Sequence, residues 1–168
     1  FRYPVAQMYI KFFCKITDMK VEVKGDMSKH KPTLFVSNHL GYLDIPILGS
    51  IIKASFVSKK SVEKWPIIGT LAKLQGTVFI KRGKKTEAGK QANNLTEKIQ
   101  QADNLIVFPE GTSWYGNHVL PFKSSLFSIA NQKVKYKKKA ELNYLKVQPI
   151  SISFSKLIIS KSEFLQGQ

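Results

Sequence analysis

The stretch Thr33-Leu34-Phe35-Val36 is short, apolar and partly β-branched, and the polar cluster Ser37-Asn38-His39 follows it directly. This pattern is typical of a buried strand that delivers polar groups at its carboxyl end. Similar apolar runs recur later in the chain, at Ser55-Phe56-Val57, Thr77-Val78-Phe79-Ile80, Leu105-Ile106-Val107-Phe108 and Val147 to Phe154. We therefore predict that these runs are strands of one sheet.

Stretches with helical character separate the apolar runs. They are predicted at 44–52, 67–74, 86–102 and 123–131. Because strands that alternate with helices form parallel sheets, this order indicates an α/β domain with a mostly parallel central sheet flanked by helices. A shorter alternating run, Val21-Glu22-Val23, predicts a strand before the turn at Gly25-Asp26.

The first 17 residues predict an amphipathic helix. Its apolar residues recur at steps of three and four, which places them on one helical face: Val5, Met8, Tyr9, Phe12, Phe13 and Ile16. Two interpretations stay open, because such a helix either packs on the domain or lies on a membrane. The chain is therefore divided into this helix over 1–17 and a domain over 18–168.

The composition suits one globular domain with an anionic partner. The 168 residues are 43% hydrophobic, enough to bury a core, which excludes disorder of the whole chain. Lys and Arg number 27 against 11 Asp and Glu, a formal net charge of +16, which favours a polyanion, an acidic protein or an anionic membrane. No stretch approaches the roughly 18 uninterrupted apolar residues of a membrane-spanning helix. The lone Cys14 has apolar neighbours and is expected to be a buried thiol.

Polar groups follow three of the predicted strands, where ligands bind in open α/β sheets. The first group holds His39 and Asp44, which a straight helix would place about 140° apart, so the backbone must turn between them, as Gly41 permits. Asp44 would then hold one imidazole nitrogen and leave the other free to take a proton. The alternative is a helix start that Asn38 or Asp44 caps, with His39 merely polar.

The other two groups carry charge. Lys81 and Arg82 end one strand, and the arginine fork matches phosphate oxygens, although surface cations give the same pattern. Glu110 follows another strand and is expected to bind a substrate hydroxyl or Arg82, while Gly111 lets backbone N–H groups approach an anion. A capping turn is the simpler alternative. We expect no metal site, because the three histidines show no ligand spacing, and no covalent intermediate, because no nucleophile motif is present.

Taken together and in this order, the segments resemble the four sequence blocks of the glycerolipid acyltransferases, and most closely the PlsC-type 1-acyl-sn-glycerol-3-phosphate acyltransferases. The blocks are His39-x4-Asp44, Phe79-Ile80-Lys81-Arg82, Phe108-Pro109-Glu110-Gly111-Thr112 and Val147-Gln148-Pro149-Ile150. Lys59 and Trp65-Pro66-Ile67-Ile68-Gly69 resemble two further elements of the family. The resemblance covers residues 33–152.

The resemblance implies acyl transfer from acyl-CoA or acyl carrier protein to the free sn-2 hydroxyl of 1-acyl-sn-glycerol 3-phosphate, a lysophospholipid, with no other cofactor. The product would be phosphatidic acid, in phospholipid biosynthesis. It makes His39 the general base and Asp44 its orienting partner. Lys81 and Arg82, with Glu110, Gly111 and Thr112, would bind the acceptor. It also implies a membrane-associated protein on the cytoplasmic face of a bacterial inner membrane, the core of a slightly longer chain.

One departure from the family pattern concerns the acceptor. Many members have arginine after Glu-Gly-Thr, whereas this chain has Ser113 followed by Trp114 and Tyr115. Relatives that acylate lyso-ornithine lipids resemble this variant, so that acceptor is the alternative to lysophosphatidate. The five lysines in 133–139 are expected to be a solvated loop or a contact with anionic lipid or carrier protein. A non-catalytic basic module for membrane or nucleic acid is the rival of a different class, but no nucleic-acid motif supports it.

Overall fold

A five-stranded parallel sheet forms the centre of the computed structural model. The structure describes residues 8, 11–12, 14–66, 68–80, 99, 104–114, 118, 120–123, 128–131, 133–135 and 142–154. The sheet has the order β3-β2-β4-β1-β7, and each neighbouring pair is parallel. Its strands are β1 (Thr33–Ser37), β2 (Ser55–Lys59), β3 (Val78–Ile80), β4 (Leu105–Val107) and β7 (Lys146–Ile150). The predicted α/β class with a mostly parallel sheet is confirmed.

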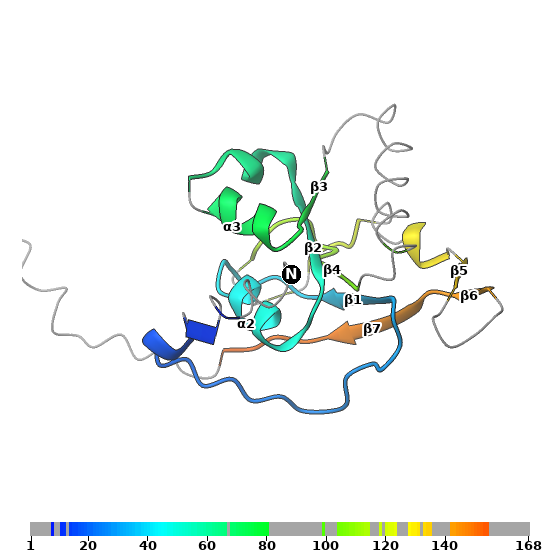
Figure 1. Cartoon of the computed structure of the whole chain (residues 1–168), viewed down its shortest axis with the longest axis horizontal. Coiled ribbons are helices and arrows are strands. Elements are labelled where there is room, and N and C mark those ends of the chain that lie inside the picture. The colour runs from blue at the N-terminus through cyan, green and yellow to red at the C-terminus, as the bar shows by residue number, and fades with distance from the viewer. Residues whose placement is uncertain are drawn as a thin grey trace, which may run out of the picture.

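Helical segments connect and cover the strands (Figure 1). They are α2 (Asp44–Ile51), the 3-10 segment η1 (Lys60–Lys64), α3 (Ile68–Leu74) and the 3-10 segment η3 (Ser128–Asn131). The predictions at 44–52 and 67–74 are confirmed to within a residue, apart from residue 67, which is outside the described part. Of the helix predicted at 86–102, only Ile99 is described, and it is helical. Of the helix predicted at 123–131, residues 128–131 form the 3-10 segment η3.

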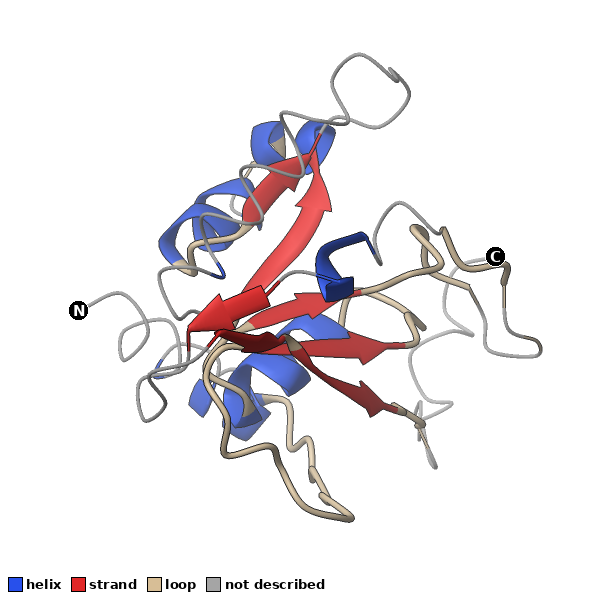
Figure 2. Ribbon diagram, turned by 90° about the vertical axis from the view of Figure 1, so that its right-hand side faces the viewer, coloured by secondary structure: helices blue, strands red, loops and turns tan. Residues whose placement is uncertain are grey.

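The alternating directions of neighbouring side chains in the strands give the sheet two apolar faces. On one face, Phe35, Phe56 and Ile106 pack with Leu48 of α2. On the other, Leu34, Leu105 and Val107 belong to a second buried cluster with residues of β2 and β3. Figure 2 shows α2 against the sheet and η1 with α3 together near β2 and β3. Both faces of the central strands are buried, as parallel sheets require.

The strand predicted at Val21-Glu22-Val23 is wrong. The segment has no strand geometry, and a groove of about 430 Å³ is bounded by this segment, α2 and residues 148–154. The chain just after this segment is joined to β7 by a side chain rather than by a backbone ladder. Gln148 accepts the N–H of Ser28 at 2.7 Å and donates to the carbonyl of Asp26 at 2.7 Å. An alternating sequence forms a strand only where a neighbouring strand edge is within pairing distance.

Four other predictions concern the chain ends, the lysine run and Cys14. The strand predicted over 147–154 ends at Ile150. The helix predicted over 1–17 stays a prediction, because much of that range lies outside the described residues. The lysine run begins in a short antiparallel hairpin, β5 (Lys133–Lys135) with β6 (Leu142–Tyr144), although its later residues are not described. Cys14 is half-buried rather than buried, and desolvation raises the pKa of its thiol.

Candidate active site

His39 and Asp44 meet directly after β1. His39 Nδ1 lies 2.7 Å from Asp44 Oδ2, and the Asp44 side chain is 0% exposed. The same oxygen accepts the backbone N–H groups of Leu40 at 2.6 Å and Gly41 at 3.0 Å. Three donors therefore converge on one oxygen, while Asp44 Oδ1 is buried and has no hydrogen-bond partner among the described residues. The predicted pairing of the two side chains is present.

The turn between them does not depend on a special glycine conformation. Gly41 is absent from the glycines with positive φ, and a Cβ built there would meet nothing within 4 Å. The backbone turns because Asp44 opens α2 and its carboxylate collects the N–H groups of the preceding loop. The expectation that Gly41 supplies the turn through its freedom is thus wrong, and its N–H is what contributes.

The segment after β4 holds the backbone of His39 on both sides. Glu110 Oε1 accepts the His39 N–H at 3.1 Å, and the N–H of Trp114 donates to the His39 carbonyl at 2.9 Å. Glu110 is 5% exposed, so its carboxylate is committed to this inner position. Sequence reasoning assigned Glu110 to a substrate hydroxyl or Arg82 and missed this contact with the backbone of the first block.

The imidazole of His39 lies on the ring of Phe108. The two centroids are 4.1 Å apart with planes 18° from parallel, and Phe108 in turn lies near Phe56 of the core at 6.2 Å. With one nitrogen bound to Asp44 and one ring face covered, the orientation of the imidazole is fixed from two directions. Phe108 was quoted as part of a sequence block, but its position beneath the histidine follows only from the pairing of β1 with β4.

Asn38 connects the start of this loop to the other neighbour of β1. Its amide donates to the carbonyl of Ile152 at 3.0 Å and accepts the N–H of Ile152 at 2.8 Å. The side chain therefore acts like one more residue of the β1–β7 ladder beyond Ile150. Asn38 does not cap α2, as one interpretation of the sequence had it, and nothing in the spacing indicates a partner 114 residues away.

The remaining predicted site residues lie in or beside the turn after β4, or outside the described part of the chain. Gly111 has φ +74° in a tight turn, and its N–H donates to the Phe108 carbonyl at 3.0 Å. Its predicted role, to let backbone N–H groups approach an anion, stays a prediction. Thr112 and Ser113 are exposed beside this turn. Lys81 and Arg82 lie outside the described residues, and their predicted contact with the acceptor stays a prediction. The structure brings Glu110 to His39, which in turn pairs with Asp44.

The described part of the chain holds neither a metal-binding cluster nor a bilayer-spanning helix. No three His, Cys, Asp or Glu side chains there are grouped to hold a metal ion. In the same residues, no helix has both the length and the apolar character that a bilayer-spanning helix needs.

Residues 19–153 match the model of the protein family described as Acyltransferase. The chain belongs to the Acyltransferase family. It is 35% identical over 142 residues to a lyso-ornithine lipid O-acyltransferase of Rhizobium meliloti, covering 84% of this chain and 48% of that protein. It is 32% identical over 114 residues to a 1-acyl-sn-glycerol-3-phosphate acyltransferase of Neisseria gonorrhoeae, covering 67% and 45%.

A crystal structure of another protein shares the fold of this chain. The 1-acyl-sn-glycerophosphate acyltransferase PlsC from Thermotoga maritima superposes with a TM-score of 0.63 at 21% identity, covering 89% of this chain and 65% of that one. The suspected resemblance to PlsC-type and glycerolipid acyltransferases is confirmed at the level of family and fold. The chain spans about half the length of the curated relatives it matches.

Proposed function

We propose that this acyltransferase transfers an acyl chain from a thioester donor to the hydroxyl of a lysolipid, with His39 as the general base. The observation that carries the proposal is the 2.7 Å contact between His39 Nδ1 and the buried Asp44 carboxylate. Asp44 accepts the Nδ1–H, which leaves the Nε2 lone pair as the acceptor of a proton. The ring is 18% exposed, so an acceptor hydroxyl has access to it.

The reaction follows from this arrangement without a covalent enzyme intermediate. The acceptor hydroxyl gives its proton to His39 Nε2 as its oxygen attacks the thioester carbonyl. The negative carboxylate of Asp44 stabilises the imidazolium that forms. The tetrahedral oxyanion then collapses, the carbon–sulfur bond breaks, and the leaving thiolate takes the proton back from the imidazolium. An ester and a free thiol are the products.

We propose lyso-ornithine lipid as the acceptor. Relatives named lyso-ornithine lipid O-acyltransferase support this choice, as in Rhizobium meliloti at 35% and Rhodobacter capsulatus at 43% identity. An ornithine head group joined through its α-amino group keeps one ammonium and one carboxylate, so it needs fewer cations than a phosphate monoester. Ser113, in the exposed position after Glu-Gly-Thr, fits this lower demand.

Lysophosphatidate is the second candidate acceptor. The relatives named 1-acyl-sn-glycerol-3-phosphate acyltransferase support it, and Arg82 would then bind the phosphate bidentately. The donor is acyl-CoA or acyl carrier protein in either case. A membrane-bound acceptor requires a protein that works at a bilayer surface, which we place at the cytoplasmic face of a bacterial inner membrane.

The test is a thiol-release assay with the 168-residue chain. Each acceptor is offered in turn with acyl-CoA and with acyl carrier protein, and mass spectrometry identifies the product. We expect His39→Ala to abolish thiol release and Arg82→Ala to raise the KM of lysophosphatidate far more than that of lyso-ornithine lipid. Undiminished acylation by His39→Ala would refute the mechanism, and product formed only from lysophosphatidate would refute the preferred acceptor.

A further inference from the structure

The helix α3 turns its apolar side to solvent. Ile68, Leu71 and Leu74 are 45%, 43% and 51% exposed, and steps of three residues place them along one side of the helix. A surface helix of a globular protein normally buries this stripe and exposes its polar side. In α3 this stripe is exposed, and Gly69 is the buried residue of the helix.

The packing of the opposite side of α3 explains why the apolar stripe is exposed. Gly69 lies buried on η1, where an added Cβ would be 2.3 Å from the backbone carbonyl oxygen of Glu63. Its N–H donates to the carbonyl of Trp65 at 2.9 Å, and Lys73 of α3 pairs with Glu63 of η1. Close backbone contact and an ion pair therefore hold the Gly69 side of α3 against η1. As a result, Ile68, Leu71 and Leu74 are exposed to solvent.

The exposed stripe continues to the loop that holds His39. Trp65, just before α3, lies 5.8 Å from Tyr42 between ring centroids, and Tyr42 belongs to the turn between His39 and Asp44. Both aromatic side chains are exposed. Tryptophan and tyrosine place an apolar ring in lipid and a polar group in water, so they suit a bilayer interface. We call Tyr42, Trp65, Ile68, Leu71 and Leu74 the apolar rim.

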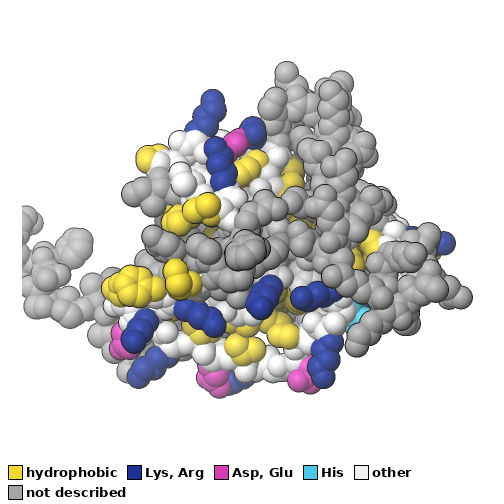
Figure 3. Space-filling model, in the orientation of Figure 1, with side chains coloured by type: hydrophobic (Ala, Val, Ile, Leu, Met, Phe, Trp, Pro, Cys, Tyr) yellow, Lys and Arg dark blue, Asp and Glu magenta, His cyan; other side chains and the backbone are white. Residues whose placement is uncertain are grey.

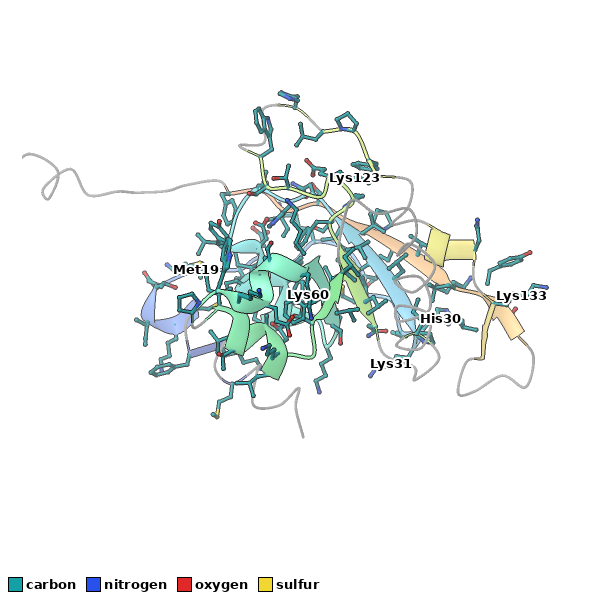
Figure 4. All side chains as sticks on the ribbon, turned by 90° about the horizontal axis from the view of Figure 1, so that it is seen from above. Met19, His30, Lys31, Lys60, Lys123 and Lys133 are labelled. Atoms are coloured by element: carbon teal, nitrogen blue, oxygen red, sulfur yellow. The ribbon has the colours of Figure 1, made fainter. Side chains whose placement is uncertain are left out.

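Positive charge surrounds the apolar rim. Residues 59–74 contain four lysines and one glutamate. Figure 3 shows apolar side chains beside lysines over η1 and α3 at the upper left. Since η1 follows the carboxyl end of β2, the rim lies at the same edge of the sheet as His39. The β5–β6 hairpin lies at the amino end of β7, and Figure 4 shows Lys133 of the hairpin far from Lys60 of η1.

We propose that the apolar rim seats on an anionic bilayer, so that the His39 loop meets the lysolipid at the membrane surface. The proposal rests on the function proposed above, because a lysolipid acceptor resides in a bilayer. The rim supplies apolar side chains to the acyl region, and the lysines of residues 59–74 face the phosphate groups. The occupant is the lipid surface, whose negative charge complements the lysines, rather than a further segment of a longer chain or a second copy.

Vesicle sedimentation tests directly whether the apolar rim binds an anionic bilayer. The 168-residue chain is mixed with vesicles of phosphatidylcholine and phosphatidylglycerol, and its partition coefficient is compared with that of Leu71→Gln/Leu74→Gln, which keeps good helix formers in α3. We expect a loss of at least tenfold for this double variant. Lys64→Gln should lose about fivefold, since one lysine near an anionic surface contributes about 1 kcal/mol, and high salt should reduce that difference.

Matched controls come from the opposite edge of the sheet. Val147 is 45% exposed in β7, close to the values in α3, and Val147→Thr should keep vesicle binding within twofold of the unchanged chain. Lys133→Gln likewise controls for Lys64→Gln. Wild-type chain that does not sediment with vesicles, or equal binding by the double variant and the wild type, would overturn the proposal. So would a dimer in solution that the double variant abolishes.

Two further measurements keep the proposal separate from folding and from catalysis. In the variant Trp114→Phe, Trp65 is the only tryptophan of the chain. Brominated lipid should quench the fluorescence of Trp65 when this variant binds vesicles. Unquenched Trp65 fluorescence would contradict the proposed membrane contact, and this test leaves α3 unchanged. In the activity assay, the double variant should lose acylation of vesicle-bound acceptor but keep that of a short-chain, monomeric acceptor. Rim-dependent binding without any thiol release would instead refute the proposed function alone.

Discussion

Glu110 Oε1 accepts the backbone N–H of His39 at 3.1 Å, although 71 residues separate the two in the sequence. The carboxylate is almost fully buried, so this contact places a charge where it holds the chain rather than where it meets solvent. Because the Trp114 N–H holds the carbonyl of the same residue, His39 is fixed through its backbone as firmly as through its ring. We therefore predict that Glu110 positions His39.

Replacing Glu110 separates positioning from acceptor binding. Glu110→Ala leaves the His39 N–H without its acceptor, and a shift of about 1 Å in the base costs about 100-fold in rate. Glu110→Gln keeps a carbonyl oxygen at the same place and should restore most of kcat. We expect the acceptor KM to change little in either variant. A rise in acceptor KM for both, with kcat intact, would instead make Glu110 an acceptor ligand.

Asp44→Asn tests the charge beside the imidazole. The amide keeps the shape of the carboxylate but not the negative charge that stabilises the imidazolium and selects the tautomer. We expect kcat to fall on the order of 1,000-fold or more while far-ultraviolet circular dichroism stays unchanged. Asp18→Asn is the control, because Asp18 is an exposed turn residue with φ 47° that asparagine tolerates. A tenfold or smaller loss for Asp44→Asn would argue against the proposed dyad.

Gly69 and Gly41 form a matched pair for stability. In Gly69→Ala the new Cβ meets the Glu63 carbonyl at 2.3 Å, so α3 must move off η1, at a cost of about 1–3 kcal/mol in the free energy of unfolding. In Gly41→Ala the Cβ enters open space, and we expect a change within about 0.5 kcal/mol. Urea unfolding measures both. Equal losses would mean that α3 does not depend on this close contact.

Glu63 links η1 to α3 and gives that link a pH dependence. The hydrogen bond from Lys60 is the largest cause that holds the pKa of Glu63 below its ordinary value of 4.5, and Lys73 adds to the effect. The paired carboxylate therefore favours the folded chain above pH 4.5, and this contribution is lost as the pH falls through the lowered pKa. Carboxyl titration by NMR should give a midpoint below 4.5, which Lys60→Gln raises more than Lys73→Gln does. A midpoint unmoved by Lys60→Gln would contradict this assignment.

The sequence alone predicts the local parts of this structure well. The runs at Thr33 and Leu105 become strands because short apolar stretches between polar clusters have few alternatives to a buried parallel sheet. The meeting of His39 and Asp44 is also predictable, since only one turn of chain lies between them. A turn this short leaves the two side chains little freedom to diverge once Asp44 begins a helix.

What could not be predicted depends on contacts far apart in the chain. The side chains of Asn38 and Glu110 bond to backbone groups, and any residue offers those, so no pattern of residue types identifies the partner. The outward side of α3 escaped prediction for a different reason. Periodicity shows that Ile68, Leu71 and Leu74 share a face, but only the contact of Gly69 with η1 decides that this face points away from the core.

The two hydrogen bonds between Asn38 and Ile152 have a consequence for when the site is completed during synthesis of the chain. β1 leaves the ribosome early, yet the groups that hold its polar end follow 71 and 114 residues later, at Glu110 and Ile152. A nascent chain can therefore complete β1 and α2 while the histidine still lacks its supports. Because Glu110 and Ile152 come so much later in the chain, the supports of the His39 loop are complete only once Ile152 has been synthesised.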